Sequence, residues 1–181
     1  MSVNALRGVP QLSAVLMSIA YFAYGSNMAS QRLWRRLPGA RHVEVGILRG
    51  HQLSFRKNDS GLSGKCDIEL TDNHRDEVIG VVYEISIDDK KTLDRIEGLG
   101  TGYDEKIVQI TTLSGNLLSS VTYFAIDIDH SLIPYHWYKQ HVLRGAIEHG
   151  LPADYINKIE SIESQEDLDK LRSHRELSIY L

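Results

Sequence analysis

Cysteine is almost missing from this chain. The 181 residues contain a single one, Cys66, which excludes a disulfide within the chain and favours a reducing compartment, the cytoplasm. Cys66 lies in the segment 64–70, where Cys66, Ile68 and Leu70 alternate as one face of a strand. We therefore expect a small core residue at this position rather than a nucleophile.

Long apolar runs and an excess of positive charge are missing too. No stretch reaches the roughly 18 uncharged apolar residues that a membrane-spanning helix needs, so we expect no membrane association. The net charge of −4 at pH 7 argues against a broad nucleic-acid surface, and we expect no nucleic-acid partner. The local basic cluster of Arg32, Arg35 and Arg36 beside Trp34 is interpreted as the solvated face of a helix.

Motifs for metals, nucleotides and serine nucleophiles are also absent. The eight histidines are scattered, with no HExxH motif and no Cys/His pairing at zinc spacing, so no metal site is predicted. The glycines of 98–102 follow a helical pattern and open a strand, the reverse of a dinucleotide fingerprint, and predict a tight loop beside a ligand. A GxSxG elbow does not surround Ser26, which leaves a serine hydrolase as a weak alternative.

Alternating apolar residues dominate the first two thirds of the chain and predict strands. The clearest case is Ile79, Val81, Tyr83, Ile85 and Ile87. Several strands joined by short links predict a mixed or antiparallel sheet that curls or closes. Further strands are predicted at 43–47, 53–55, 64–70, 107–113 and 121–128, and helices at 28–37, from Asp88 or Asp89 to Glu97, from Pro134 to Gly150 and from Pro152 to Ile162.

The chain shows no internal repeat and no Pro/Ser/Gly-rich linker, so we predict one α+β domain over 1–181. Met17 is a candidate internal start, and residues 1–16 are therefore expected to be a dispensable extension. The apolar run that leads into Tyr21–Tyr24 is interpreted as the first buried strand rather than as a signal peptide. The charged tail 163–181 is expected to form a frayed helix.

The segment Tyr21–Met28 carries most of the information about function. It reads Tyr-Phe-Ala-Tyr-Gly-Ser-Asn-Met, so a strand pattern ends in a small polar turn and a helix pattern follows. Such a turn leaves backbone N–H groups without partners, and those donors suit a carboxylate or an oxyanion. We predict an anion cradle at this turn.

An acid is placed at the end of a short predicted helix. The segment Leu93-Asp94-Arg95-Ile96-Glu97-Gly98 puts Glu97 directly before the glycine loop, with Asp94 on the same side of the helix. A single acid that takes a proton from one nitrogen and gives it to another is a complete catalyst for some transfers. Glu97 is therefore the candidate catalytic residue.

Together these motifs resemble the γ-glutamylcyclotransferases, a superfamily that also holds plant AIG2-like proteins and a butirosin-pathway acyl cyclotransferase. The resemblance rests on the Tyr-Gly-Ser-Asn turn, on Leu93–Gly98, and on Tyr138-Lys139 leading to Gly150-Leu151-Pro152. It runs in order from about residue 20 to 162, and 56–66 match poorly. Asn27, where the branch acting only on glutathione has leucine, argues against that branch.

The resemblance implies a small closed or nearly closed mixed β-barrel with flanking α-helices, its catalytic barrel spanning 17–162. It implies that Glu97 is the general acid/base and that the turn cradles a γ-glutamyl moiety. Three further tyrosines stand at positions where relatives have tyrosine. The implied substrate-binding residues are Tyr24, Gly25, Ser26, Asn27, Tyr103, Tyr123 and Tyr138.

The implied reaction is an intramolecular aminolysis that turns a γ-glutamyl-amino acid into 5-oxoproline and a free amine. The substrate supplies its own nucleophile, so no cofactor and no metal are expected. Relatives form dimers, and a homodimer is the assembly that this resemblance suggests. Two alternatives stay open: a cyclotransferase for γ-glutamyl amines or a biosynthetic intermediate, and a non-catalytic binding barrel.

Overall fold

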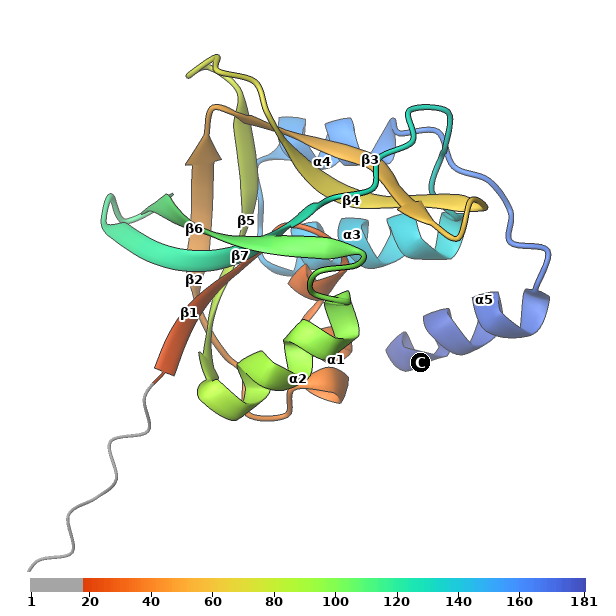
Figure 1. Cartoon of the computed structure of the whole chain (residues 1–181), viewed down its shortest axis with the longest axis horizontal. Helices are drawn as coiled ribbons and strands as arrows, with labels where there is room; N and C mark the ends of the chain where they lie inside the picture. The colour runs from red at the N-terminus through yellow and green to blue at the C-terminus, as the bar shows by residue number, and fades with distance from the viewer. Residues whose placement is uncertain (1–17) are drawn as a thin grey trace, which may run out of the picture.

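The computed structural model describes residues 18–181, and the expected extension 1–16 lies outside them (Figure 1). The described chain forms seven strands, and most of the predicted strands are found with shifted ends. The strands are β1 (Ser18–Ala23), β2 (Arg41–Arg49), β3 (His51–Asp59), β4 (Ser63–Leu70), β5 (Glu77–Ser86), β6 (Tyr103–Thr112) and β7 (Leu117–Ala125).

Five strands close into a barrel in the order β1-β5-β2-β6-β7. All of its pairs are antiparallel except the closing one, where Tyr21 of β1 lies beside Val121 of β7 in parallel. Strands β3 and β4 form a separate two-stranded hairpin, which reaches away from the barrel in Figure 1. The prediction of a closed, mixed barrel is confirmed.

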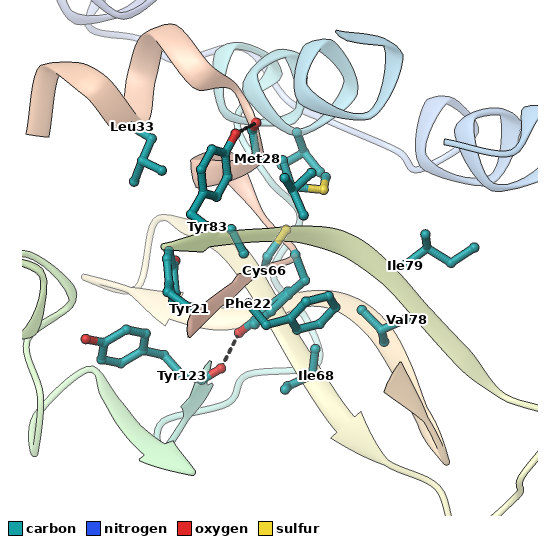
Figure 2. Packing of buried hydrophobic residues seen from close by; sticks show 14 of the residues in the cluster. Tyr21, Phe22, Met28, Leu33, Cys66, Ile68, Val78, Ile79, Tyr83 and Tyr123 are labelled. Carbon is teal, nitrogen blue, oxygen red and sulfur yellow. Dashed lines mark hydrogen bonds between the residues drawn. The ribbon is translucent and has the colours of Figure 1, made fainter. Parts of the chain in front are cut away.

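Strand β5 lies between β1 and β2 in the barrel and is buried along most of its length. Val81, Val82 and Tyr83 are each 0% exposed, so both faces of this strand are covered. Figure 2 shows Tyr83 turned towards Met28, whose carbonyl oxygen accepts a hydrogen bond from the Tyr83 hydroxyl at 2.8 Å. The alternating residues that predicted this strand therefore lie on only one of its two buried faces.

Helices flank the barrel, and their ends differ from the prediction. Ile87 begins a helix instead of ending a strand, because Ser86 and Asp89 form a reciprocal capping box. The helix predicted over 28–37 begins later, because Ala29 is extended and separates a 3₁₀ turn from the α-helix. The helical segments are η1 (Ser26–Met28), α1 (Ser30–Arg36), α2 (Ile87–Glu97), α3 (His136–Glu148), α4 (Ala153–Glu160), α5 (Lys170–Leu177) and η2 (Ser178–Tyr180).

The charged tail is anchored, which corrects the expectation of a frayed helix. Asp167 accepts hydrogen bonds from Trp137 of α3 at 2.8 Å and from Arg172 of α5 at 2.6 Å. Glu176 of α5 accepts a hydrogen bond from Arg32 of α1 at 2.6 Å. The tail therefore packs beside α1 and α3 (Figure 1).

Candidate active site

The polar turn after β1 forms the floor of a cavity. The Met28 N–H donates to Gly25 O at 3.0 Å and closes a single 3₁₀ turn. The N–H groups of Ser26 and Asn27 start this turn, where the first donors of a helix have no partner within it. Gly25 is required by packing, since a Cβ there would lie 2.9 Å from Cys66 Cβ.

Glu97 reaches this turn from the end of α2. Gly98 adopts the left-handed conformation, with φ +68°, and ends the helix directly after Glu97. Glu97 Oε1 accepts a hydrogen bond from Asn27 Nδ2 at 2.9 Å, and its side chain is 17% exposed. Two motifs 70 residues apart in the chain therefore meet in one place.

Arg36 completes this contact, which corrects the interpretation of the basic cluster as a solvated face. Its guanidinium donates to Asn27 Oδ1 at 2.9 Å and lies 3.4 Å from Glu97 Oε1. Burial lowers the pKa of Arg36, while the charge of Glu97 raises it. Arg32 is also largely buried, and only Arg35 of the three is exposed.

The four predicted tyrosines surround the turn, and each hydroxyl has a defined partner. The hydroxyl of Tyr24 donates to Tyr123 O at 2.7 Å, and that of Tyr103 donates to Cys66 O at 2.7 Å. The hydroxyl of Tyr138 accepts from the Cys66 N–H at 3.1 Å. Burial raises the pKa of all four hydroxyls, so they are neutral at physiological pH.

Asp94 holds one of these four tyrosines, Tyr123, in place. It accepts a hydrogen bond from the Tyr123 hydroxyl at 2.6 Å and one from the Lys90 ammonium. Figure 2 shows Tyr21, Phe22, Cys66 and Tyr123 close together at this end of the core. Asp94 is therefore engaged with Tyr123 and Lys90, whereas Glu97 faces the turn.

All eight predicted site residues line one cavity. Two residues that the sequence did not point to, Tyr21 and Cys66, complete its wall. The lining residues are Tyr21, Tyr24, Gly25, Ser26, Asn27, Cys66, Glu97, Tyr103, Tyr123 and Tyr138.

A serine hydrolase arrangement does not form around Ser26. Within residues 18–181 no histidine is hydrogen-bonded to it. Histidine contacts are made instead by Ser30, whose Oγ lies 3.1 Å from His149 Nε2, and by Ser164, whose Oγ lies 3.4 Å from His136 Nδ1. Ser26 therefore lacks the general base that this chemistry needs.

Two further searches cover the described part of the chain. No three His, Cys, Asp or Glu side chains of 18–181 are grouped closely enough to hold a metal ion. Over the same residues, every helix is too short or too polar to cross a bilayer.

Known proteins resemble this chain over most of its length. A curated γ-glutamylcyclotransferase of Bos taurus is 32% identical over 151 residues, which cover 81% of this chain and 79% of that protein. The chain belongs to the γ-glutamylcyclotransferase family. The Homo sapiens γ-glutamylcyclotransferase is 30% identical over 158 residues, which cover 85% of this chain and 84% of that one.

Two other comparisons agree with membership of the γ-glutamylcyclotransferase family. The AIG2-like family model matches residues 77–159. A solved γ-glutamyl cyclotransferase structure superposes with a TM-score of 0.80 at 28% identity, covering 91% of this chain and 99% of that one. The resemblance inferred from the three motifs is confirmed.

The sequence analysis of this family member did not predict that Arg36 lies beside the candidate acid, Glu97. One pattern could have indicated it. Arg32 and Arg36 are four residues apart and share a helix face. A helix that starts at the cradle and carries two cations on one face suggests a counter-charge for the acid.

Proposed function

We propose that this protein cyclises γ-glutamyl-amino acids to 5-oxoproline and a free amino acid, with Glu97 carrying the proton. One observation supports this above all: Glu97 Oε1 lies 2.9 Å from Asn27 Nδ2, at the cradle turn. An anion site and an acid thus face one cavity. The curated relatives named γ-glutamylcyclotransferase point to the same activity.

The turn would hold the γ-glutamyl moiety. Its free N–H groups at Ser26 and Asn27 suit the substrate's carboxylate or the oxyanion that develops on the γ-carbonyl. Losing one such donor typically costs about 2.7–4 kcal/mol of transition-state stabilisation. The four buried tyrosines, whose hydroxyls already have partners, would confine the glutamyl chain to a bent conformation.

The reaction then needs a bond exchange within one molecule. The α-nitrogen of the glutamyl group attacks its own γ-carbonyl carbon, a C–N bond forms, and the C–N bond to the leaving amine breaks. Holding the two ends together is an orientation effect worth several kcal/mol in favourable systems. The nucleophile belongs to the substrate, so the protein has no need to supply one.

Glu97 would move one proton between the two nitrogens. As a carboxylate it accepts a proton from the α-ammonium, which frees the attacking lone pair. It then donates that proton to the leaving nitrogen, which departs as a neutral amine. Asn27 and Arg36 hold the carboxylate in place.

The test is incubation of the full chain with γ-glutamyl-alanine, followed by detection of 5-oxoproline. Stoichiometric release of 5-oxoproline and alanine is expected. Ligand binding without a cyclised product from any γ-glutamyl compound would contradict the proposal and favour a binding barrel.

We also propose a cytoplasmic location and a homodimeric state. The location rests on the single, buried thiol of Cys66, and the dimer rests on the family resemblance alone. Sedimentation of the purified chain tests the second statement.

A further inference from the structure

A second hollow adjoins the cavity on its outer side. Its volume is about 270 Å³, and it shares Ser26, Glu97, Tyr103 and Tyr138 with the inner cavity. Cations dominate the rest of its wall. They are Arg32, Arg36, Lys57 and Lys65, and the acidic residues of the lining are Asp59 and Glu97.

Three of these cations already have carboxylate partners. Arg32 pairs with Glu176, and Arg36 pairs with Glu97. The third is Lys65, whose Nζ lies 3.0 Å from Asp59 Oδ1.

Lys57 has only a long contact with a carboxylate, the longest of the four. Its side chain is 11% exposed, yet the nearest paired oxygen, Asp59 Oδ1, is 4.0 Å away, too far for a direct hydrogen bond. Burial and the neighbouring charge of Lys65 both lower the pKa of Lys57. An ammonium this deeply placed is stabilised by an anion, and its position suits a ligand.

Lys57 also lies close to the loop that follows Glu97. Its Nζ is 5.3 Å from the centroid of the Tyr103 ring. A Cβ added at Gly102 would lie 3.4 Å from Lys57 Nζ and 3.2 Å from the carbonyl oxygen of Glu97. The lysine, the glycine loop and the end of α2 therefore meet at one point, outside the cradle turn.

We propose that Lys57 binds the carboxylate of the leaving amino acid, and that the enzyme thereby selects γ-glutamyl-amino acids over γ-glutamyl amines. This inference rests on the proposed function. The leaving nitrogen must reach Glu97, and in an amino acid the carboxylate is two bonds from that nitrogen. The carboxylate then falls in the outer hollow, where Lys57 donates to it.

The test compares two substrates that differ by one group. γ-Glutamyl-alanine and γ-glutamyl-ethylamide have matched leaving groups, except that the second lacks the carboxylate. We expect the wild-type chain to favour γ-glutamyl-alanine in kcat/KM by about tenfold or more, as for a charge-assisted hydrogen bond. Lys57→Met should raise KM for γ-glutamyl-alanine by a similar factor and leave γ-glutamyl-ethylamide within about twofold.

Lys106→Met is the matched control. Lys106 is partly buried and, like Lys57, lies over an aromatic ring, with its Nζ 5.2 Å from the Phe124 centroid. Burial lowers its pKa too, but it lies outside both hollows. This variant should keep the wild-type preference. Lys57→Arg retains a cation that can donate hydrogen bonds to a carboxylate, so this variant should keep part of the preference for γ-glutamyl-alanine.

The outcomes separate the two proposals. Equal efficiency on both substrates in the wild type, or an equal loss on both in Lys57→Met, overturns the role of Lys57 while 5-oxoproline release still supports the function. No 5-oxoproline from either substrate overturns the proposed function and this inference with it. Thermal unfolding of each variant verifies that it is folded.

Discussion

Asn27 joins three contacts that the site requires, and only an amide can make them together. Its Nδ2 donates to Tyr21 Oη at 3.0 Å and to Glu97 Oε1 at 2.9 Å, while its Oδ1 accepts from Arg36 at 2.9 Å. An aspartate lacks the two N–H donors of the amide, and a leucine lacks both these donors and the acceptor oxygen. The last letter of the Tyr-Gly-Ser-Asn motif is therefore explained by its neighbours.

At this residue scale, Glu97→Gln tests the proton carrier. Glutamine is nearly the same shape, and its Oε1 still accepts from Asn27 and Arg36, so the fold should be retained. It cannot accept and return a proton, and we expect turnover to fall by roughly 10²–10⁴-fold. Circular dichroism and 5-oxoproline release measure the two effects.

Glu84→Gln is the control for that change. Glu84 also pairs with an arginine, Arg41, at 3.1 Å, but it lies outside the cavity. It should retain wild-type turnover. A folded Glu97→Gln protein with near-normal 5-oxoproline release would remove Glu97 from the mechanism.

At the scale of elements, the site depends on how helices end and on how closely they pack. The Ser86 capping box and the left-handed Gly98 define the two ends of α2, so that Glu97 is its last residue. Helix α3 backs the cradle turn, and it approaches closely because Gly145 has no side chain. A Cβ there would lie 2.5 Å from both Ala29 N and Met28 Cβ.

Gly145→Ala should therefore destabilise the protein, although alanine favours an isolated helix by about 1 kcal/mol. The methyl group forces α3 away from η1, and overpacking of this kind typically costs about 1–3 kcal/mol. The turn moves with it, so KM for γ-glutamyl-alanine should rise. Urea unfolding and steady-state kinetics measure both.

Gly39→Ala serves as the comparison, because its added Cβ would meet only the end of the Asp89 side chain, at 3.2 Å. That variant should change stability and KM little. Unchanged stability and KM in Gly145→Ala would show that the contact with the turn is not needed.

Elements also show what the sequence could predict and what it could not. Apolar alternation predicts β5 and a sheet that curls or closes, because residues two apart in a strand share one face. The closed barrel itself was implied by the family resemblance. Alternation misses the first residues of β6, since Asp104, Glu105 and Lys106 carry no apolar pattern and are held by pairing with β7. It likewise misses most of β3, including Lys57, which pairs with Lys65 of β4 across the strands.

The candidate site divides in the same way. Local motifs predicted the turn and the acid, and the structure brings all eight predicted residues to one cavity. Arg36 and Lys57 were missed because their roles depend on partners far along the chain. The placement of Glu97 beside Arg36 is a tertiary contact across 61 residues, and no period in the sequence encodes it.

At the scale of the whole molecule, the tail braces the helix that carries Arg36. Glu176 of α5 bonds to Arg32 at 2.6 Å, and Tyr180 Oη lies 2.6 Å from His141 Nδ1. His141 is 0% exposed. His141 Nε2 lies 3.0 Å from Arg32 Nη1 and 3.2 Å from Glu176 Oε2, so the buried ring contacts both members of this ion pair.

This buried ring predicts a loss of stability in acid. Burial, with the nearby charge of Arg32, lowers the pKa of His141 to about 4, from 6.5 in the unfolded chain, although Glu176 opposes the shift. The native state therefore binds fewer protons than the unfolded state between these values, so stability is full above pH 6.5 and falls towards pH 4. The lowered pKa corresponds to on the order of 3 kcal/mol.

Urea unfolding at a series of pH values between 7 and 4 measures this effect. His141→Gln removes the titration and should flatten the stability curve over that range relative to the wild type. Glu176 titrates lower, since its bonds to His141 and Arg32 lower its pKa to about 2, and it contributes little in this window. His130→Gln, at an exposed histidine, should keep the wild-type slope. Parallel curves for the wild type and His141→Gln would show that His141 does not couple the tail to pH.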